Sequence, residues 1–436
     1  MRHNSYARQL SAWGVPALYS GAAIVAGLTF PRIEGELFPT LASPMSISSG
    51  TAIFSSIASG MIALTGIVFS LTFVMVQFSA TAYSPRLVLW MSRDPLVSHA
   101  IGVFTATFLY AISALAWVDR QSSGKVPFFS GWLVVVFLLA SVGVFVGLVQ
   151  SLSRLQVHSV LAFTGNFARR IIDVMYPPLE RSVKLVGGIE GPPSPLTQSV
   201  VYHGPPEAVQ LLNLPALTAL AERTQGVIEV VSAVGDTLVE STPLVRVYGG
   251  HQVIGERELR KTIRTGLQRT FEQDPKYSIQ LLRDIAIRAL SPAINDPTTA
   301  VQALDQIEDL LLRLGRRHLE IGEIRDKSGR LRVIIQVPTW DDFLDLAFSE
   351  ICSYGAESKQ VMRRMKALLS DLLVALPEER HSALHRQQKR LDGTIARAFP
   401  DVEDQREASA EDREGLGLTR KHQTHGSSRT SALSVR

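Results

Sequence analysis

The length, composition and charge of the chain exclude several classes of protein. Its 436 residues suffice for two or three domains. Lys and Arg (44) nearly balance Asp and Glu (40), and no nucleic-acid-binding motif is present, so we expect no nucleic-acid partner. The single cysteine, Cys352, excludes an internal disulfide and suits a reducing compartment.

Four long apolar runs lie within the first 150 residues, and no comparable run follows. A helix needs about 20 apolar residues to cross a bilayer core, where it satisfies its own backbone hydrogen bonds. We therefore predict an all-α membrane domain over residues 1–150. Its four transmembrane helices are expected at residues 13–30, 52–80, 96–118 and 128–150. No small-residue cleavage site follows the first run, so we expect it to be retained as a span.

Basic residues flank the predicted spans unevenly. Arg2 and Arg8 precede the first span, and Arg86 and Arg93 lie in the second loop. Further Lys and Arg residues accumulate after the fourth span. The positive-inside rule then predicts that both termini are cytoplasmic, although two basic residues in the third loop oppose this orientation.

The chain beyond the fourth span is predicted to form a helical extension, a cytoplasmic domain and a tail. Residues 151–175 continue the fourth span as an amphipathic helix. Pro- and Gly-rich sequence marks the next boundary, and residues 176–400 are predicted to form an α+β domain, mostly helical with a few short strands. Residues 401–436 contain many charged residues, Ser and Gly but few apolar residues, so we predict disorder.

Hydrophobic periodicity predicts the elements of the cytoplasmic domain. Helices are expected at residues 207–223, 256–271, 275–290, 297–314, 340–354, 356–374 and 377–399. Strands are expected near Val200, at 227–233 and at 243–249, with a hairpin around 327–329.

Small and polar residues form a stripe along the second predicted span. Their spacing of three or four residues places them on one helical face, and they are Ser56, Ser59, Ala63, Gly66, Ser70 and Gln77. Two interpretations remain open: close packing between helices, which we favour, and a water-lined pathway. No charged side chain lies mid-span, which argues against a proton-coupled pump and leaves a passive pore built from several copies.

The loop after the second span contains two oxygen-bearing residues before a proline, Ser84-Pro85 and Asp94-Pro95. Both pairs are typical of helix starts, so a short helix at the membrane surface is expected between them. Arg86 and Arg93 then face lipid headgroups or the soluble domain. The simpler interpretation of this loop is that these residues only mark where helices start and end.

The segment DIAIRALSPAINDPTTA, residues 284–300, is the densest polar motif. Asp284 and Arg288 are four apart and are predicted to pair on one helix, and Asp296 is predicted to cap the next helix at Pro297. We favour this capped helical hairpin. A ligand or anion site at the helix start would use Arg288, Asn295, Thr298 and Thr299, with Ser291 in the turn before it. A divalent cation held by Asp284, Asn295 and Asp296 would lack ligands, so no metal is predicted.

Motifs of the common catalytic classes are missing from the sequence. It contains no nucleophile elbow, phosphate-binding glycine loop, metalloprotease motif or kinase signature. The pair Gly235-Asp236 is typical of a turn between strands. We therefore expect a protein that is not an enzyme and has no cofactor and no catalytic residues.

Several segments resemble a family of bacterial predicted membrane proteins, domain of unknown function 2254. They are TGIVFSLTFVMVQFSATAYSPRL, GVFTATFLYA, DIAIRALSPAINDPTTAVQALD and the turn VGDTLVESTPL. The resemblance covers most of the chain from Ser48 to Cys352, and Thr298 stands where the family is associated with an aromatic residue. It implies a multi-pass protein of the bacterial inner membrane with an amino-terminal helical domain, and it implies no activity.

Three functional hypotheses follow from these features. The first is an oligomeric passive channel gated by its cytoplasmic domain, suggested by the stripe on a long second span. The alternative is a membrane-anchored scaffold or sensor whose cytoplasmic domain binds a protein or small ligand. A third is lipid handling through Arg86 and Arg93.

Overall fold

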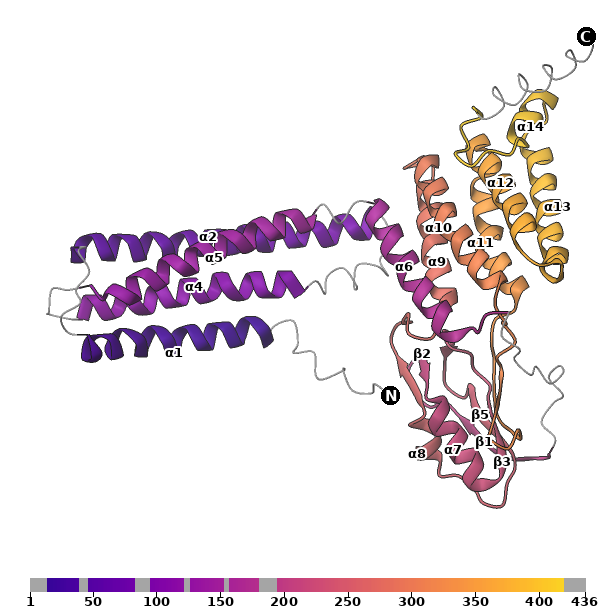
Figure 1. The fold of residues 1–436 in the computed structure, drawn as a ribbon, viewed down its shortest axis with the longest axis horizontal. Helices are drawn as coiled ribbons and strands as arrows, with labels where there is room; N and C mark the ends of the chain where they lie inside the picture. Colours follow the sequence, from indigo (N-terminus) through magenta and orange to yellow (C-terminus); the bar gives the residue numbers. More distant parts are fainter. Residues whose placement is uncertain are drawn as a thin grey trace, which may run out of the picture. The chain divides into compact units, whose positions relative to one another are not determined.

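The computed structural model describes residues 14–38, 46–82, 95–120, 126–152, 157–179 and 194–418. The chain divides into two compact units, residues 1–156 and residues 157–436, which we call the membrane unit and the carboxy-terminal unit (Figure 1). Each unit has its own hydrophobic core.

The membrane unit contains the four predicted apolar helices. They are α1 (Gly14–Leu37), α2 (Ile47–Ala82), α4 (Pro95–Arg120) and α5 (Phe128–Leu152). Each is long and apolar enough to cross a membrane, which confirms the four predicted spans. α4 is the central helix, because it packs against α1, α2 and α5. α2 has 36 residues and extends about 54 Å, so it exceeds the ~30 Å bilayer core.

Close contacts and buried hydrogen bonds join these helices. A Cβ on Gly27 would lie 2.6 Å from the Cβ of Ser113, so this glycine allows α1 to approach α4. The buried carboxylate of Glu34 accepts hydrogen bonds from the backbone N–H groups of Phe129 (2.7 Å) and Ser130 (2.9 Å). An acidic side chain thus caps the start of α5, where the helix has unsatisfied donors.

Two β-sheets lie in the carboxy-terminal unit. One has the strand order β1-β5-β3-β8-β7, and the other has the order β4-β2-β6. The strands are β1 (Leu196–Val201), β2 (Glu207–Leu212), β3 (Gly226–Val230), β4 (Thr237–Leu238), β5 (Pro243–Gly249), β6 (Ile263–Gly266), β7 (Glu323–Arg325) and β8 (Leu331–Ile335). The antiparallel pairs β3–β5 and β7–β8 confirm the predicted strands and hairpin. Helix α7 (Leu214–Thr224) packs on β3 and β8.

A helical bundle forms the rest of this unit. Its helices are α6 (Val157–Met175), α9 (Pro275–Ala289), α10 (Pro297–Gly315), α11 (Trp340–Tyr354), α12 (Lys359–Ala375), α13 (His381–Ala398) and α14 (Val402–Ala408). A 3₁₀ turn at Glu378–Arg380 precedes α13, and the short α8 (Glu256–Arg260) lies next to β6. α9 packs against α6, α10 and α11, and α12 packs against α10 and α13. Apolar residues at helical spacing supply the buried face of each long helix.

Two of the predicted helices are wrong in part. The start of 207–223 is strand β2, and the end of 256–271 contains strand β6; these two strands pair with each other. Asn213 accepts a hydrogen bond from Ala216 N–H and starts α7, so the helix begins only after the strand. Both segments are short and lack a strict apolar–polar alternation, and their pairing with each other selects the strand conformation.

The predicted disorder from residue 401 is also wrong over residues 401–418. Asp401 caps α14, and Ala408 is fully buried. Lys359 on α12 bonds Asp404 (2.5 Å) and Glu407 (2.7 Å). Charged residues that we associated with a solvated tail therefore pair with the bundle. Residues 419–436 lie outside the described residues.

Candidate functional site

The small and polar stripe of α2 points away from the other helices of the membrane unit. Phe54, Met61 and Val68, on the opposite face, are buried against the core. All six stripe residues are exposed, and they are Ser56, Ser59, Ala63, Gly66, Ser70 and Gln77. A shallow groove runs along this face and is lined by Ala63, Gly66, Ile67, Ser70, Leu71 and Val74.

The exposed position of the stripe limits how it can pack. Among the described residues, the hydroxyls of Ser56, Ser59 and Ser70 have no hydrogen-bond partner. A Cβ placed on Gly66 would have nothing within 4 Å. In the part of the chain that the structure describes, Ser56, Ser59, Gly66 and Ser70 therefore do not serve packing within one membrane unit. Close packing through this face requires a second molecule, and otherwise the face meets lipid or water.

The predicted headgroup-binding arginines cannot be placed. Arg86 and Arg93, and the short helix expected between Pro85 and Met91, lie outside the described residues. The lipid-handling hypothesis therefore stays a prediction from sequence.

The motif at residues 284–300 forms the predicted capped hairpin between α9 and α10. Asp296 accepts hydrogen bonds from Thr299 N–H (3.1 Å) and the Thr299 hydroxyl (2.6 Å), and Pro297 is the first helical residue. The Ser291 hydroxyl donates to the carbonyl of Arg288 (2.7 Å). These bonds satisfy backbone groups at two helix ends, which confirms the structural interpretation of Asp296.

The remaining polar residues of this motif lie at the surface or in its turn. Asp284 pairs with the adjacent Arg283 (2.9 Å). Asn295 has a positive φ of 48°, a conformation that Asn tolerates in turns. Asn295 and Thr298 are exposed, and the motif lines neither of the two cavities described below.

One cavity of about 390 Å³ lies beside the start of α9. Its wall is mainly apolar, and both of its carboxylates already have partners: Asp274 pairs with Arg269 (2.6 Å), and Glu272 pairs with Arg264. Burial raises the pKa of Asp274, and the Arg269 guanidinium offsets part of that rise. A Cβ on Gly235 would lie 2.5 Å from Asp274 Oδ2, so the turn of the VGD sequence closes over this ion pair.

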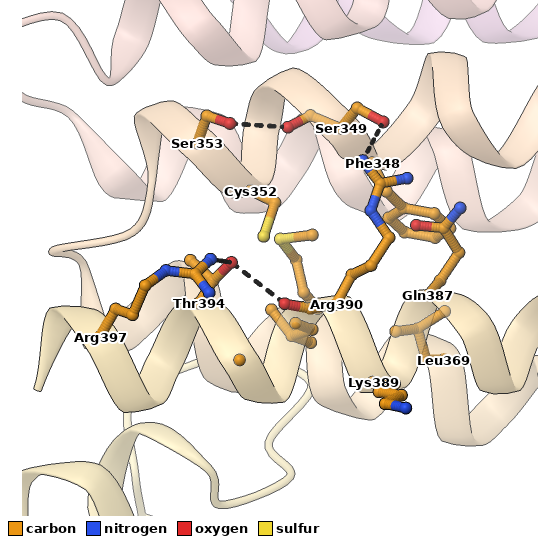
Figure 2. A pocket seen from close by; sticks show the side chains of 13 residues that line it. Phe348, Ser349, Cys352, Ser353, Leu369, Gln387, Lys389, Arg390, Thr394 and Arg397 are labelled. Atoms are coloured by element: carbon orange, nitrogen blue, oxygen red, sulfur yellow. Dashed lines mark hydrogen bonds between the residues drawn. The ribbon is translucent and has the colours of Figure 1, made fainter.

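A second cavity, of about 270 Å³, lies between α11, α12 and α13 (Figure 2). Its apolar lining includes Phe348, Met365, Leu369 and Leu391, each at most 2% exposed. Its polar lining includes the adjacent Lys389 and Arg390 and, about two turns later on α13, Arg397. The thiol of Cys352 on α11 also lines it, and no carboxylate does. Figure 2 shows the Cys352 thiol pointing from α11 toward α13.

Sequence reasoning missed this second cavity. Lys389, Arg390 and Arg397 occur in a helix that carries many other charged residues, so their spacing alone does not distinguish them from a solvated face. Gly393 was the one local signal, because a glycine within a helix is destabilising unless it has a structural reason. Here, the missing side chain of Gly393 leaves space for the cavity that Gly393 and Cys352 both line.

Comparison with known proteins assigns the family. Residues 9–371 match the family described as "Predicted membrane protein (DUF2254)". The chain belongs to this family. It is 25% identical over 378 residues to uncharacterized proteins of Mycobacterium bovis and Mycobacterium tuberculosis, covering 83% of this chain and 71% of each relative. No solved structure matches the chain.

Proposed function

We propose that this protein is a homo-oligomeric passive channel, without enzymatic activity, in which the α2 stripe of each copy meets that of its neighbours. The exposed position of the stripe on α2 carries this proposal. The protein would lie in the bacterial inner membrane with both termini in the cytoplasm. Its carboxy-terminal unit would then be cytoplasmic and would gate the pore.

A second copy of the chain is the occupant that fits this face best. Polar groups in contact with lipid tails are costly unless they find a partner or water. Small residues let two helices approach closely, and a symmetric contact brings an identical stripe opposite the first. Three or more copies around an axis would leave the serine hydroxyls facing a central, water-filled space.

The alternative is a membrane-anchored sensor in which the helices dimerise without a pore. The cavities of the carboxy-terminal unit favour it, because concave and partly apolar sites with a few polar groups typically bind small ligands. Both proposals place α2 between subunits, and they are distinguished by whether solutes cross the membrane.

Disulfide cross-linking in native membranes tests the subunit contact. On a Cys352→Ser background, single cysteines would replace Ser56, Ser59 or Ser70. Two copies can bridge only where their Cα atoms come within about 7 Å, so we expect dimers from stripe positions. Leu139 on α5 is 65% exposed and Val68 is fully buried, and cysteines at these positions serve as controls. Equal cross-linking at Leu139, or none along the stripe, would remove α2 from the contact.

Ion flux through reconstituted vesicles separates the channel from the sensor. Ser70→Trp places a bulky ring on the stripe, and we expect it to reduce flux about tenfold or more. Phe69→Trp is the matched control, because Phe69 is 60% exposed on the same helix and lies beside the stripe. Cross-linked protein that gives no flux above empty vesicles would eliminate the channel and leave the sensor.

A further inference from the structure

The cavity between α11, α12 and α13 has the chemistry of a binding site for a small amphipathic anion. Its apolar wall comes from three helices, and Phe348, Met365 and Leu369 are almost fully buried in it. Its polar side carries three cationic side chains from one helix and no carboxylate. We propose that it binds a small organic acid with a short apolar chain. This proposal does not rest on the channel.

The cations differ in how far they are already neutralised. Arg390 donates to Asp345 (2.7 Å) and Ser349 (3.3 Å), so it is fixed at the edge of the cavity. Arg397 donates only to the Thr394 hydroxyl (3.1 Å), and neither it nor Lys389 has a carboxylate partner among the described residues. Lys389 and Arg397 are therefore available to an incoming carboxylate, which guanidinium groups bind with two parallel hydrogen bonds.

The shape of the cavity limits the size of the ligand. At about 270 Å³ it is slightly smaller than typical drug-binding pockets of 300 Å³ or more. A single short chain fits this space, whereas a phospholipid with two acyl chains does not. Gly393 faces the cavity, and a Cβ there would meet only Arg397 Nη1, at 3.4 Å. A larger side chain at Gly393 is thus predicted to fill the cavity without displacing the core.

Cys352 makes the proposal directly testable, because it is the only thiol in the chain and lines the cavity. The experiment measures the rate at which a maleimide labels Cys352 in the full-length protein in detergent, with and without octanoate below its micellar concentration. We expect octanoate to slow labelling at least fivefold and saturably. Octanol, which lacks the charge, phosphate, which lacks the chain, and phosphatidylglycerol, which has two chains, should leave the rate within twofold.

Variants of the cavity separate binding from an effect of octanoate on the micelle. Gly393→Leu should label slowly without ligand and respond to octanoate less than twofold. Arg397→Gln should weaken the octanoate effect about tenfold in concentration, while Arg406→Gln, on the exposed surface of α14, should not. Protection that is equal with octanol, or that persists unchanged in both Gly393→Leu and Arg397→Gln, would overturn the proposal.

Discussion

At the scale of single residues, Asp326 organises the turn between β7 and β8. Its carboxylate accepts hydrogen bonds from the Ser328 hydroxyl (2.6 Å), from the backbone N–H groups of Ser328 (2.9 Å) and Arg330 (3.0 Å), and from Arg332 Nε (2.9 Å). The Ser328 hydroxyl, followed by Arg332 and the backbone donors, holds the pKa of Asp326 well below its usual value of 3.8. The charged form of Asp326 therefore stabilises this hairpin.

The depressed pKa of Asp326 predicts the pH range in which its contribution is lost. A carboxyl with a lower pKa in the folded state stabilises the fold fully above its unfolded pKa and loses that stabilisation as pH falls through its folded pKa. We expect Asp326→Asn to lower the urea midpoint at pH 7, and the gap from wild type to shrink below about pH 4. Circular dichroism in detergent measures the urea midpoint of each protein at each pH. The exposed Glu357→Gln is the control, and a gap independent of pH would contradict the assignment.

The sequence allowed some polar residues to be assigned and not others. Asp296 was predictable as a cap because it precedes Pro297 and bonds Thr299, three residues away. Glu34 was not, because the α5 backbone that it caps lies 95 residues further along the chain. Likewise, the ion pair of Asp274 and Arg269 is local, but the Gly235 turn that closes over it is not. Contacts between residues a few positions apart can be predicted from the sequence, whereas contacts between residues far apart in the sequence cannot.

At the scale of elements, α14 shows how a charged segment becomes ordered. Lys359 of α12 donates to Asp404 and Glu407, and these two carboxylates raise the pKa of Lys359, with Asp404 contributing most. Exposed ion pairs contribute little to stability. The fully buried Ala408 must therefore supply much of the attachment, through contact with the bundle.

Substituting Ala408 tests whether α14 is attached in this way. Ala408→Glu would bury an unpaired charge, so we expect α14 to detach and trypsin to cleave after Arg413 at least about tenfold faster. Val402→Glu is the matched control, because Val402 is 78% exposed on the same helix. Limited proteolysis followed by mass spectrometry identifies the cleavage site and measures the rate of cleavage after Arg413. Equal cleavage of the two variants would mean that the segment is loose, as its composition suggested.

Element boundaries were predicted best where periodicity is long and caps are local. The helix predicted at 340–354 coincides with α11, which Thr339 and Asp342 start with a reciprocal capping box. By contrast, β2 and β6 are short segments without strict apolar–polar alternation, and each was assigned to a helix. The cavity between α11, α12 and α13 was not predictable either, because it depends on how three correctly predicted helices pack.

At the scale of the whole molecule, the sequence predicted the amphipathic helix after the fourth span but not the surface that it packs against. We predicted residues 151–175 as a helical extension of the fourth span; α6 packs on α9 and α10 of the carboxy-terminal unit, and the link at 153–156 lies outside the described residues. The rings of Phe167 and Phe271 lie 4.8 Å apart, and Arg169 pairs with Asp309 at 2.6 Å. Amphipathic periodicity identified the helix, but it could not identify the surface that covers the apolar face.

This packing predicts where the carboxy-terminal unit can be separated from the membrane unit. A fragment from Val157 to Leu418 retains α6 and is expected to unfold cooperatively as a soluble protein. A fragment from Pro177 to Leu418 loses buried side chains that include Val160, Leu161 and Ile172, each worth about 1.5–3 kcal/mol. At roughly 2–4 °C per kcal/mol, its melting temperature should fall by about 10 °C or more, or it should aggregate. Differential scanning calorimetry measures the melting temperatures of the two fragments. Equal melting temperatures would show that α6 contributes nothing to this unit, and the boundary would then move to the end of α6.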